Sequence, residues 1–79
     1  MHIHHELDTR GKTCPLPVLK LSRLLASMQP GELVRVVVSD AESARDVPRA
    51  MHRGGHELVE SVEAAGEWTF TIRRAEPTP

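Results

Sequence analysis

Hydrophobic and polar positions repeat with two periods along the chain, and the shorter one is the two-residue period of β-strands. Residues 2–8 alternate between two faces and predict a first strand. Residues 32–39 carry a run of β-branched side chains, which predicts a central strand. Residues 56–63 and 67–74 predict a closing hairpin that turns at residues 64–66. The side chains that we expect to face inward from the second and fourth strands are Val34, Val36, Val38, Trp68, Phe70 and Ile72.

The longer period is the spacing of a helix, and it predicts a first helix over residues 15–28, which the sequence Gln29-Pro30-Gly31 ends. Leu16 and Leu19 lie off the apolar stripe of this helix. Two interpretations of these leucines remain open: an exposed apolar patch that docks a partner protein, or a broader core face. The stripe itself consists of Val18, Leu21, Leu24, Leu25 and Met28.

A second helix is predicted between the central strand and the hairpin. Asp40 is a favourable N-cap for it, and Gly54-Gly55 ends it. Pro48 interrupts the stretch, so we expect a short first turn to about Asp46 and then a restart with Pro48 near its beginning. The order of elements is βαβαββ. We therefore expect an α+β fold: a two-layer α/β sandwich, with two helices on one face of a four-stranded mixed sheet.

The composition narrows the class of protein. We expect the 79 residues, of which 39% are apolar, to form one domain over 1–79 with a frayed tail at 76–79. The net charge of −1 at pH 7 argues against a dedicated nucleic-acid-binding protein. Apolar runs fall short of the roughly 20 residues that a membrane span needs, and the first residues lack the apolar core of a signal peptide. We therefore expect a cytoplasmic monomer that binds neither nucleic acid nor membrane.

Basic residues are concentrated in the part of the chain that contains the one cysteine. Residues 10–53 hold eight Lys and Arg residues against four acidic ones. Two interpretations remain open, because such a surface can steer an acidic partner or can be an ordinary solvated mixture of charges.

The segment Cys14-Pro15-Leu16-Pro17 is the most informative in the chain. Two prolines this close would break the interior of a helix, but the first N–H groups of a helix have no intrahelical partner. We therefore expect Cys14 to be the N-cap of the first helix, with Pro15 at its first position and Pro17 at its third. In that place the prolines stiffen the turn that presents the thiol.

The expected surroundings of Cys14 favour an anion. The N-terminal end of a helix carries about half a positive charge, the N–H groups of Leu16 and Val18 would be free, and Lys12 lies two residues upstream. We therefore expect a lowered pKa for the Cys14 thiol and a stabilised persulfide anion. Because the chain has one cysteine, it can form no internal disulfide, and a sulfur atom carried here must leave to another protein.

Four segments in a fixed order carry a family resemblance: residues 7–17 (LDTRGKTCPLP), 28–32 (MQPGE), 45–48 (RDVP) and 56–58 (HEL). Over about residues 6–74 the chain resembles the TusA/SirA family of small sulfur-carrier proteins. The resemblance implies that Cys14 accepts a persulfide sulfur from a cysteine desulfurase or a rhodanese-like donor and relays it to an acceptor protein. It implies a sulfurtransferase in the sense of a relay, with the covalent persulfide in place of a cofactor. Members serve tRNA thiolation, molybdenum-cofactor supply, sulfur oxidation or selenium metabolism.

Arg45 and Asp46 allow two interpretations. They form a local ion pair that steadies the restart of the second helix, which is worth little if exposed, or they take part directly in sulfur transfer. From the resemblance we expect Cys14 to be the catalytic residue. The supporting residues that we expect around it are Lys12, Pro15, Leu16, Pro17, Arg45 and Asp46.

The histidines are the remaining candidates for chemistry. His2 and His4 lie two residues apart on one strand face, and His52 and His56 lie four apart with two glycines between them. A zinc site needs three or four ligands with supporting hydrogen bonds, so we predict no metal site. Two alternative functions stay open: a non-catalytic regulatory or protein-binding module, and metal binding through the histidines.

Overall fold

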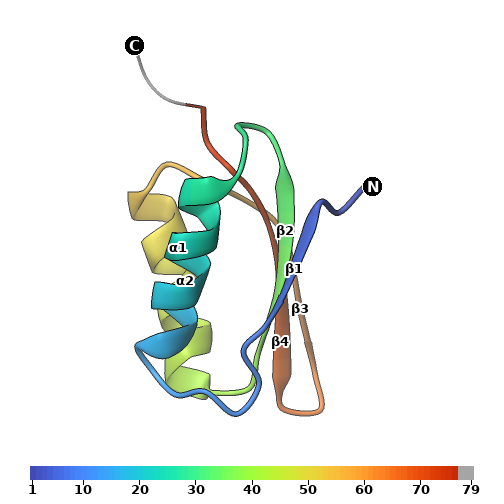
Figure 1. Ribbon diagram of the computed structural model, residues 1–79. Helices are drawn as coiled ribbons and strands as arrows, with labels where there is room; N and C mark the ends of the chain where they lie inside the picture. Colours follow the sequence, from blue (N-terminus) through green and yellow to red (C-terminus); the bar gives the residue numbers. More distant parts are fainter. Residues whose placement is uncertain (77–79) are drawn as a thin grey trace.

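The computed structural model describes residues 1–76 and contains two helices and four strands in the predicted order βαβαββ (Figure 1). Residues 77–79, which make up most of the predicted frayed tail, lie outside the described residues. Neither helix in the described part of the chain has the length and apolar character that crossing a bilayer requires. The elements are β1 (His5–Asp8), α1 (Leu16–Ser27), β2 (Leu33–Val38), α2 (Ala41–Arg53), β3 (Glu57–Ala64) and β4 (Glu67–Arg73).

The four strands form one mixed sheet in the order β1-β2-β4-β3. β1 pairs with β2 in parallel, and the other two pairings are antiparallel. Both helices cover the same face of the sheet (Figure 1), which confirms the predicted two-layer sandwich. Because each of the parallel strands leads into a helix, α1 and α2 begin at the same end of the sheet (Figure 1). This arrangement brings the cysteine before α1 close to the first turns of α2.

The core lies between the sheet and the two helices. The register aligns Val34 with Ile72 and Val36 with Phe70, so these side chains share the inner face, as predicted. Trp68 is half-buried against them. Each fully buried side chain of this size contributes roughly 1.5–3 kcal/mol, which fixes the helices on the sheet. The core residues are Leu21, Leu25, Met28, Val34, Val36, Val38, Val47, Met51, Phe70 and Ile72.

Two predictions about the helices are wrong in detail. The N-cap of α1 is Pro15 rather than Cys14, so Pro17 occupies the second helical position. α2 runs without a break from Ala41 to Arg53 with Pro48 inside it, where a restart was predicted. One helical face of α2 buries three side chains, Ser43, Val47 and Met51. Their packing offsets the hydrogen bond that the proline removes, because tertiary packing supplies most of the stability of a protein helix.

The strand predictions hold, with small shifts at the ends. β1 begins at His5 rather than at residue 2. The hairpin turns at Ala65 and Gly66, which both have positive φ angles, of 53° and 79°. Two positive values in succession are the geometry of the two-residue turns that match the twist of paired strands.

Candidate functional site

Cys14 lies at the end of a loop that is fixed to the C-terminal end of β2. Thr9 is fully buried, and both its backbone N–H and its hydroxyl donate to the Val37 carbonyl, at 2.9 and 2.6 Å. The N–H of Gly11 donates to the hydroxyl oxygen of Ser39 at 2.8 Å. These contacts hold the loop so that Cys14 arrives at a defined place, half-buried beside the start of α2.

Asp40 ties the cysteine to α2. One oxygen of its carboxylate accepts hydrogen bonds from the N–H and the hydroxyl of Ser43, at 3.0 and 2.8 Å, which is the predicted N-cap. The same oxygen accepts the N–H of Cys14 at 3.2 Å. These hydrogen bonds stabilise the charged carboxylate and lower the pKa of Asp40. One side chain thus caps α2 and positions the backbone of Cys14.

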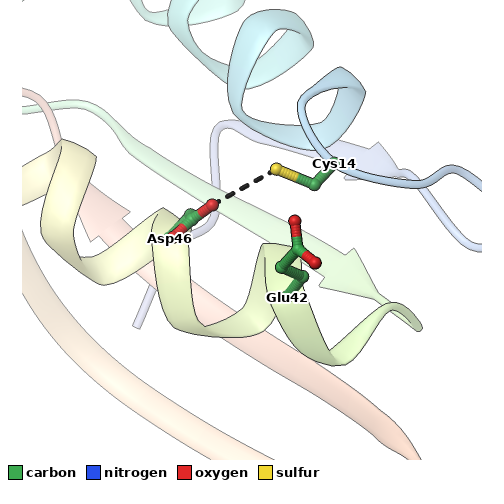
Figure 2. Close-up of side chains that lie close together, drawn as sticks. All are labelled: Cys14, Glu42 and Asp46. Atoms are coloured by element: carbon green, nitrogen blue, oxygen red, sulfur yellow. Dashed lines mark hydrogen bonds between the residues drawn. The ribbon is translucent and has the colours of Figure 1, made fainter.

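Two carboxylates of α2 face the sulfur atom of Cys14 (Figure 2). The thiol donates a hydrogen bond to Asp46 Oδ2, with 3.2 Å between sulfur and oxygen. Glu42 lies one helical turn before Asp46. The sulfur and one oxygen of each carboxylate all lie within 4.8 Å of one another. Asp46, a predicted supporting residue, therefore contacts the thiol directly. Glu42 was not predicted as part of the site.

The pKa of the Cys14 thiol is raised from 9.0 to about 11, which is opposite to the predicted direction. The hydrogen bond to Asp46 is the largest cause, burial of the sulfur is the second, and the charges of Asp46 and Glu42 add to both. Fewer N–H groups are free to bind an anion than predicted, because the N–H of Leu16 donates to the Thr13 carbonyl at 2.9 Å. The resting cysteine is a protonated thiol that is hydrogen-bonded to a carboxylate.

An open pocket of about 350 Å³ lies beside Cys14, between α1 and α2. Asp46 lines it next to the sulfur, and the exposed arginines Arg49 and Arg53 line it further along α2. None of the ion pairs within residues 1–76 includes either arginine. The apolar walls of the pocket are Pro15, Val18 and Ala50.

The structure places the other predicted supporting residues in different surroundings. Leu16 and Leu19 are 43% and 52% exposed, so they lie outside the core and form an apolar surface next to Cys14. Pro17 is fully buried, so it fixes α1 against the rest of the fold. Lys12 and Arg45 are exposed. Among residues 1–76, no ion pair joins Arg45 to Asp46, so the local ion pair is not formed.

Three residues of the site were missed in the sequence: Glu42, Arg49 and Arg53. Together with Asp46 they lie four, three and four residues apart, which is the spacing of one face of a helix. That spacing is the signal that would have found them. It was obscured by the predicted break at Pro48, which places the two halves of the helix on unrelated faces.

Two of the five histidines accept hydrogen bonds from the backbone. His4 Nδ1 accepts the N–H of Leu33 at 3.0 Å, and His56 Nδ1 accepts the N–H of Ala75 at 2.9 Å. His5 Nε2 lies 3.0 Å from Glu32 Oε1. Within residues 1–76, the grouping of three metal-ligand side chains is Cys14, Glu42 and Asp46, and it contains no histidine.

A small two-layer sandwich that presents one cysteine from a Cys-Pro-X-Pro turn defines a class of protein, the small sulfur carriers. Comparison with known proteins agrees: residues 5–74 match the family model for the sulfurtransferase TusA. The sulfur carrier protein TusA of Pseudomonas aeruginosa is 40% identical over 68 residues, covering 86% of each chain. That of Allochromatium vinosum is 36% identical over 70 residues, covering 89% of this chain and 92% of its own.

A solved structure shares the fold as well. The crystal structure of a SirA-like protein from Desulfitobacterium hafniense has a TM-score of 0.79 and 26% identity, and the match covers 91% of this chain and 99% of that one. The chain therefore belongs to the TusA family. It is a sulfur carrier in the general sense of that family, whose members work between sulfur donors and acceptors.

Proposed function

We propose that Cys14 carries a sulfur atom as a persulfide, which it takes from a donor protein and passes to an acceptor protein. The observation that carries the proposal is the thiol itself: it is half-buried, hydrogen-bonded to Asp46, and open to a pocket between the helices. The donor is a cysteine desulfurase or a rhodanese-like protein. The sulfur is held covalently, with no separate cofactor.

The loading step exchanges one S–S bond for another. The Cys14 thiolate attacks the outer sulfur of the donor persulfide R–S–SH, the S–S bond of the donor breaks, and its thiolate leaves. The proton of Cys14, which the resting thiol donates to Asp46 Oδ2 at 3.2 Å, passes to solvent, and the leaving thiolate takes up one proton from solvent. The products are Cys14–S–SH and R–SH, so atoms and charge balance without an oxidant.

Unloading runs in the opposite sense. A thiolate of the acceptor attacks the outer sulfur, and Cys14 leaves as a thiolate that is protonated again beside Asp46. A raised thiol pKa, about 11, keeps the emptied carrier protonated and unreactive. The same carboxylates disfavour an anionic persulfide at this place, which favours handing the sulfur on.

The surface around Cys14 supports docking with other proteins. Leu16 and Leu19 expose apolar area next to the thiol, and Arg49 and Arg53 add positive charge on the facing helix. Such a mixture suits transient contacts with an apolar centre and a charged rim. We propose that the protein acts as a monomer in the cytoplasm, where a free thiol stays reduced. The sulfur it carries then enters tRNA thiolation, molybdenum-cofactor supply or sulfur oxidation.

The loading step is tested with purified protein, a cysteine desulfurase and cysteine, followed by intact mass spectrometry without reductant. We expect an adduct of one sulfur atom on the wild-type protein and none on Cys14→Ala. Absence of the adduct from the wild type, or its presence on the variant, refutes the proposal. In cells that lack the native protein, restoration of function by Cys14→Ser would favour the non-catalytic binding module instead.

A further inference from the structure

The pocket beside Cys14 has two ends of opposite charge. At one end the thiol donates to Asp46, and the carboxylate of Glu42 lies close to the sulfur outside the pocket lining. At the other end are Arg49 and Arg53, whose guanidinium groups form no ion pair within residues 1–76. A ligand that fits this arrangement carries an anionic tail and a reactive head that enters in its protonated, neutral form, because an anionic head would be repelled by the carboxylates.

The length of the pocket indicates the size of this ligand. Arg49 and Arg53 lie three and seven residues beyond Asp46 on α2, which is roughly 4.5 and 10.5 Å along the helix axis. Three extended residues of a peptide span about 10 Å. The volume of about 350 Å³ falls within the range of small-molecule sites. The walls of Pro15, Val18 and Ala50 are suited to contact the aliphatic part of such a ligand.

We propose that this pocket binds the persulfide of a short peptide thiol that bears carboxylates, and that Cys14 takes the outer sulfur from this small donor directly. Arg49 and Arg53 bind the carboxylates, which places the S–SH head against the Cys14 sulfur. Charge-assisted hydrogen bonds from guanidinium to carboxylate are the strong members of their kind and orient the ligand. The inference rests on the persulfide role proposed above and adds a second class of donor to it.

The reaction balances as Cys14–SH plus R–S–SH giving Cys14–S–SH plus R–SH. The bond between the two sulfur atoms of the small donor breaks, and a new bond forms between its outer sulfur and Cys14 Sγ. The proton of Cys14 passes to solvent, and a proton from solvent returns to the leaving peptide thiolate. No oxidant or reductant is needed, since the transferred sulfur keeps its oxidation state.

The test uses glutathione persulfide as the probe and its diethyl ester, in which both carboxylates are masked, as the comparison. Loading of Cys14 is followed by intact mass over time, for the wild type and for Arg49→Gln/Arg53→Gln. We expect the double variant to load about tenfold more slowly from the free acid, and within about twofold of the wild type from the ester. Lys20→Gln/Arg23→Gln, which removes the same charge from exposed positions of α1 outside the pocket, is the control.

Equal losses with acid and ester, no loss with either, or an equal loss in the control variant would overturn the inference. Should the pocket variant fail to fold, the wild type alone is compared with the two donors. We expect faster loading from the free acid than from the ester, with a difference that added salt removes, and equal rates count against the pocket. Loading by a cysteine desulfurase is measured in parallel. If the desulfurase does not load the wild type, the proposed function is refuted. If it does, but loading from glutathione persulfide does not depend on the two arginines, only the proposal of a small donor is refuted.

Discussion

The contact between Cys14 and Asp46 predicts both the direction and the size of a change in the pKa of the Cys14 thiol. Asp46→Asn keeps the shape of the side chain but removes its charge. Because the hydrogen bond to Asp46 is the largest cause of the raised thiol pKa, the variant should move the pKa of Cys14 down from about 11 toward 9.0. Burial and the charge of Glu42 remain, so the new pKa lies between these two values.

The change in reactivity follows from this shift. The thiolate is the species that reacts, and at pH 7 its fraction rises about tenfold for each pKa unit that the thiol loses. The intrinsic nucleophilicity of the thiolate falls at the same time, by roughly threefold for each unit. A pKa lower by one therefore gives alkylation about threefold faster, and a complete return to 9.0 gives about tenfold.

The assay is the rate of alkylation by iodoacetamide as a function of pH, followed by intact mass. The midpoint of the profile gives the pKa of Cys14 directly. Glu63→Gln, which removes one acid from an exposed position of β3, is the control and should leave both midpoint and rate unchanged. A midpoint in Asp46→Asn that equals or exceeds the wild-type value, or slower alkylation at pH 7, would refute the electrostatic reasoning.

Three further predictions concern stability. Ala65→Asn should raise the free energy of unfolding by about 1 kcal/mol, because asparagine tolerates the positive φ that alanine holds in this turn; an unchanged thermal midpoint would contradict it. Among residues 1–76 the fully buried Thr71 hydroxyl has no hydrogen-bond partner, so Thr71→Val should raise the free energy of unfolding in urea by about 1 kcal/mol, and destabilisation would contradict this reasoning. Burial lowers the pKa of His56 below 6.5, and its Nδ1 accepts the Ala75 N–H, so stability should fall as pH drops below 6.5. A His56→Gln variant with an equally steep acid loss would exclude this cause.

The fold could be predicted because its signals are local. The alternation in the strands, the helical spacing of Leu21, Leu25 and Met28, and the capping carboxylate of Asp40 each act within a few residues. The apolar pattern then tells which face of each helix or strand is buried, without knowledge of the element that packs against it. The long α2 was misjudged for the same reason: Pro48 is a local signal for a break, whereas the burial of Val47 and Met51 against the sheet depends on the tertiary fold.

The electrostatics of the site could not be predicted from local sequence. The helix-terminus argument considered charges within a few residues of Cys14, and it gave a lowered thiol pKa. The carboxylate that dominates belongs to a residue 32 positions away in sequence, and the parallel arrangement of the two βα units brings it to the sulfur. The candidate residue, Cys14, could be selected from the sequence because of its prolines, but its protonation state depends on a contact between helices.

The central claim is that Cys14 carries one transferable sulfur atom, and cyanide tests it most directly. Cyanide removes the outer sulfur of a persulfide as thiocyanate and leaves the thiol behind. After loading by a cysteine desulfurase and removal of the donor, the wild-type protein should release one thiocyanate per chain and return to its unmodified mass. Release of none, or equal release from Cys14→Ser, would contradict the account.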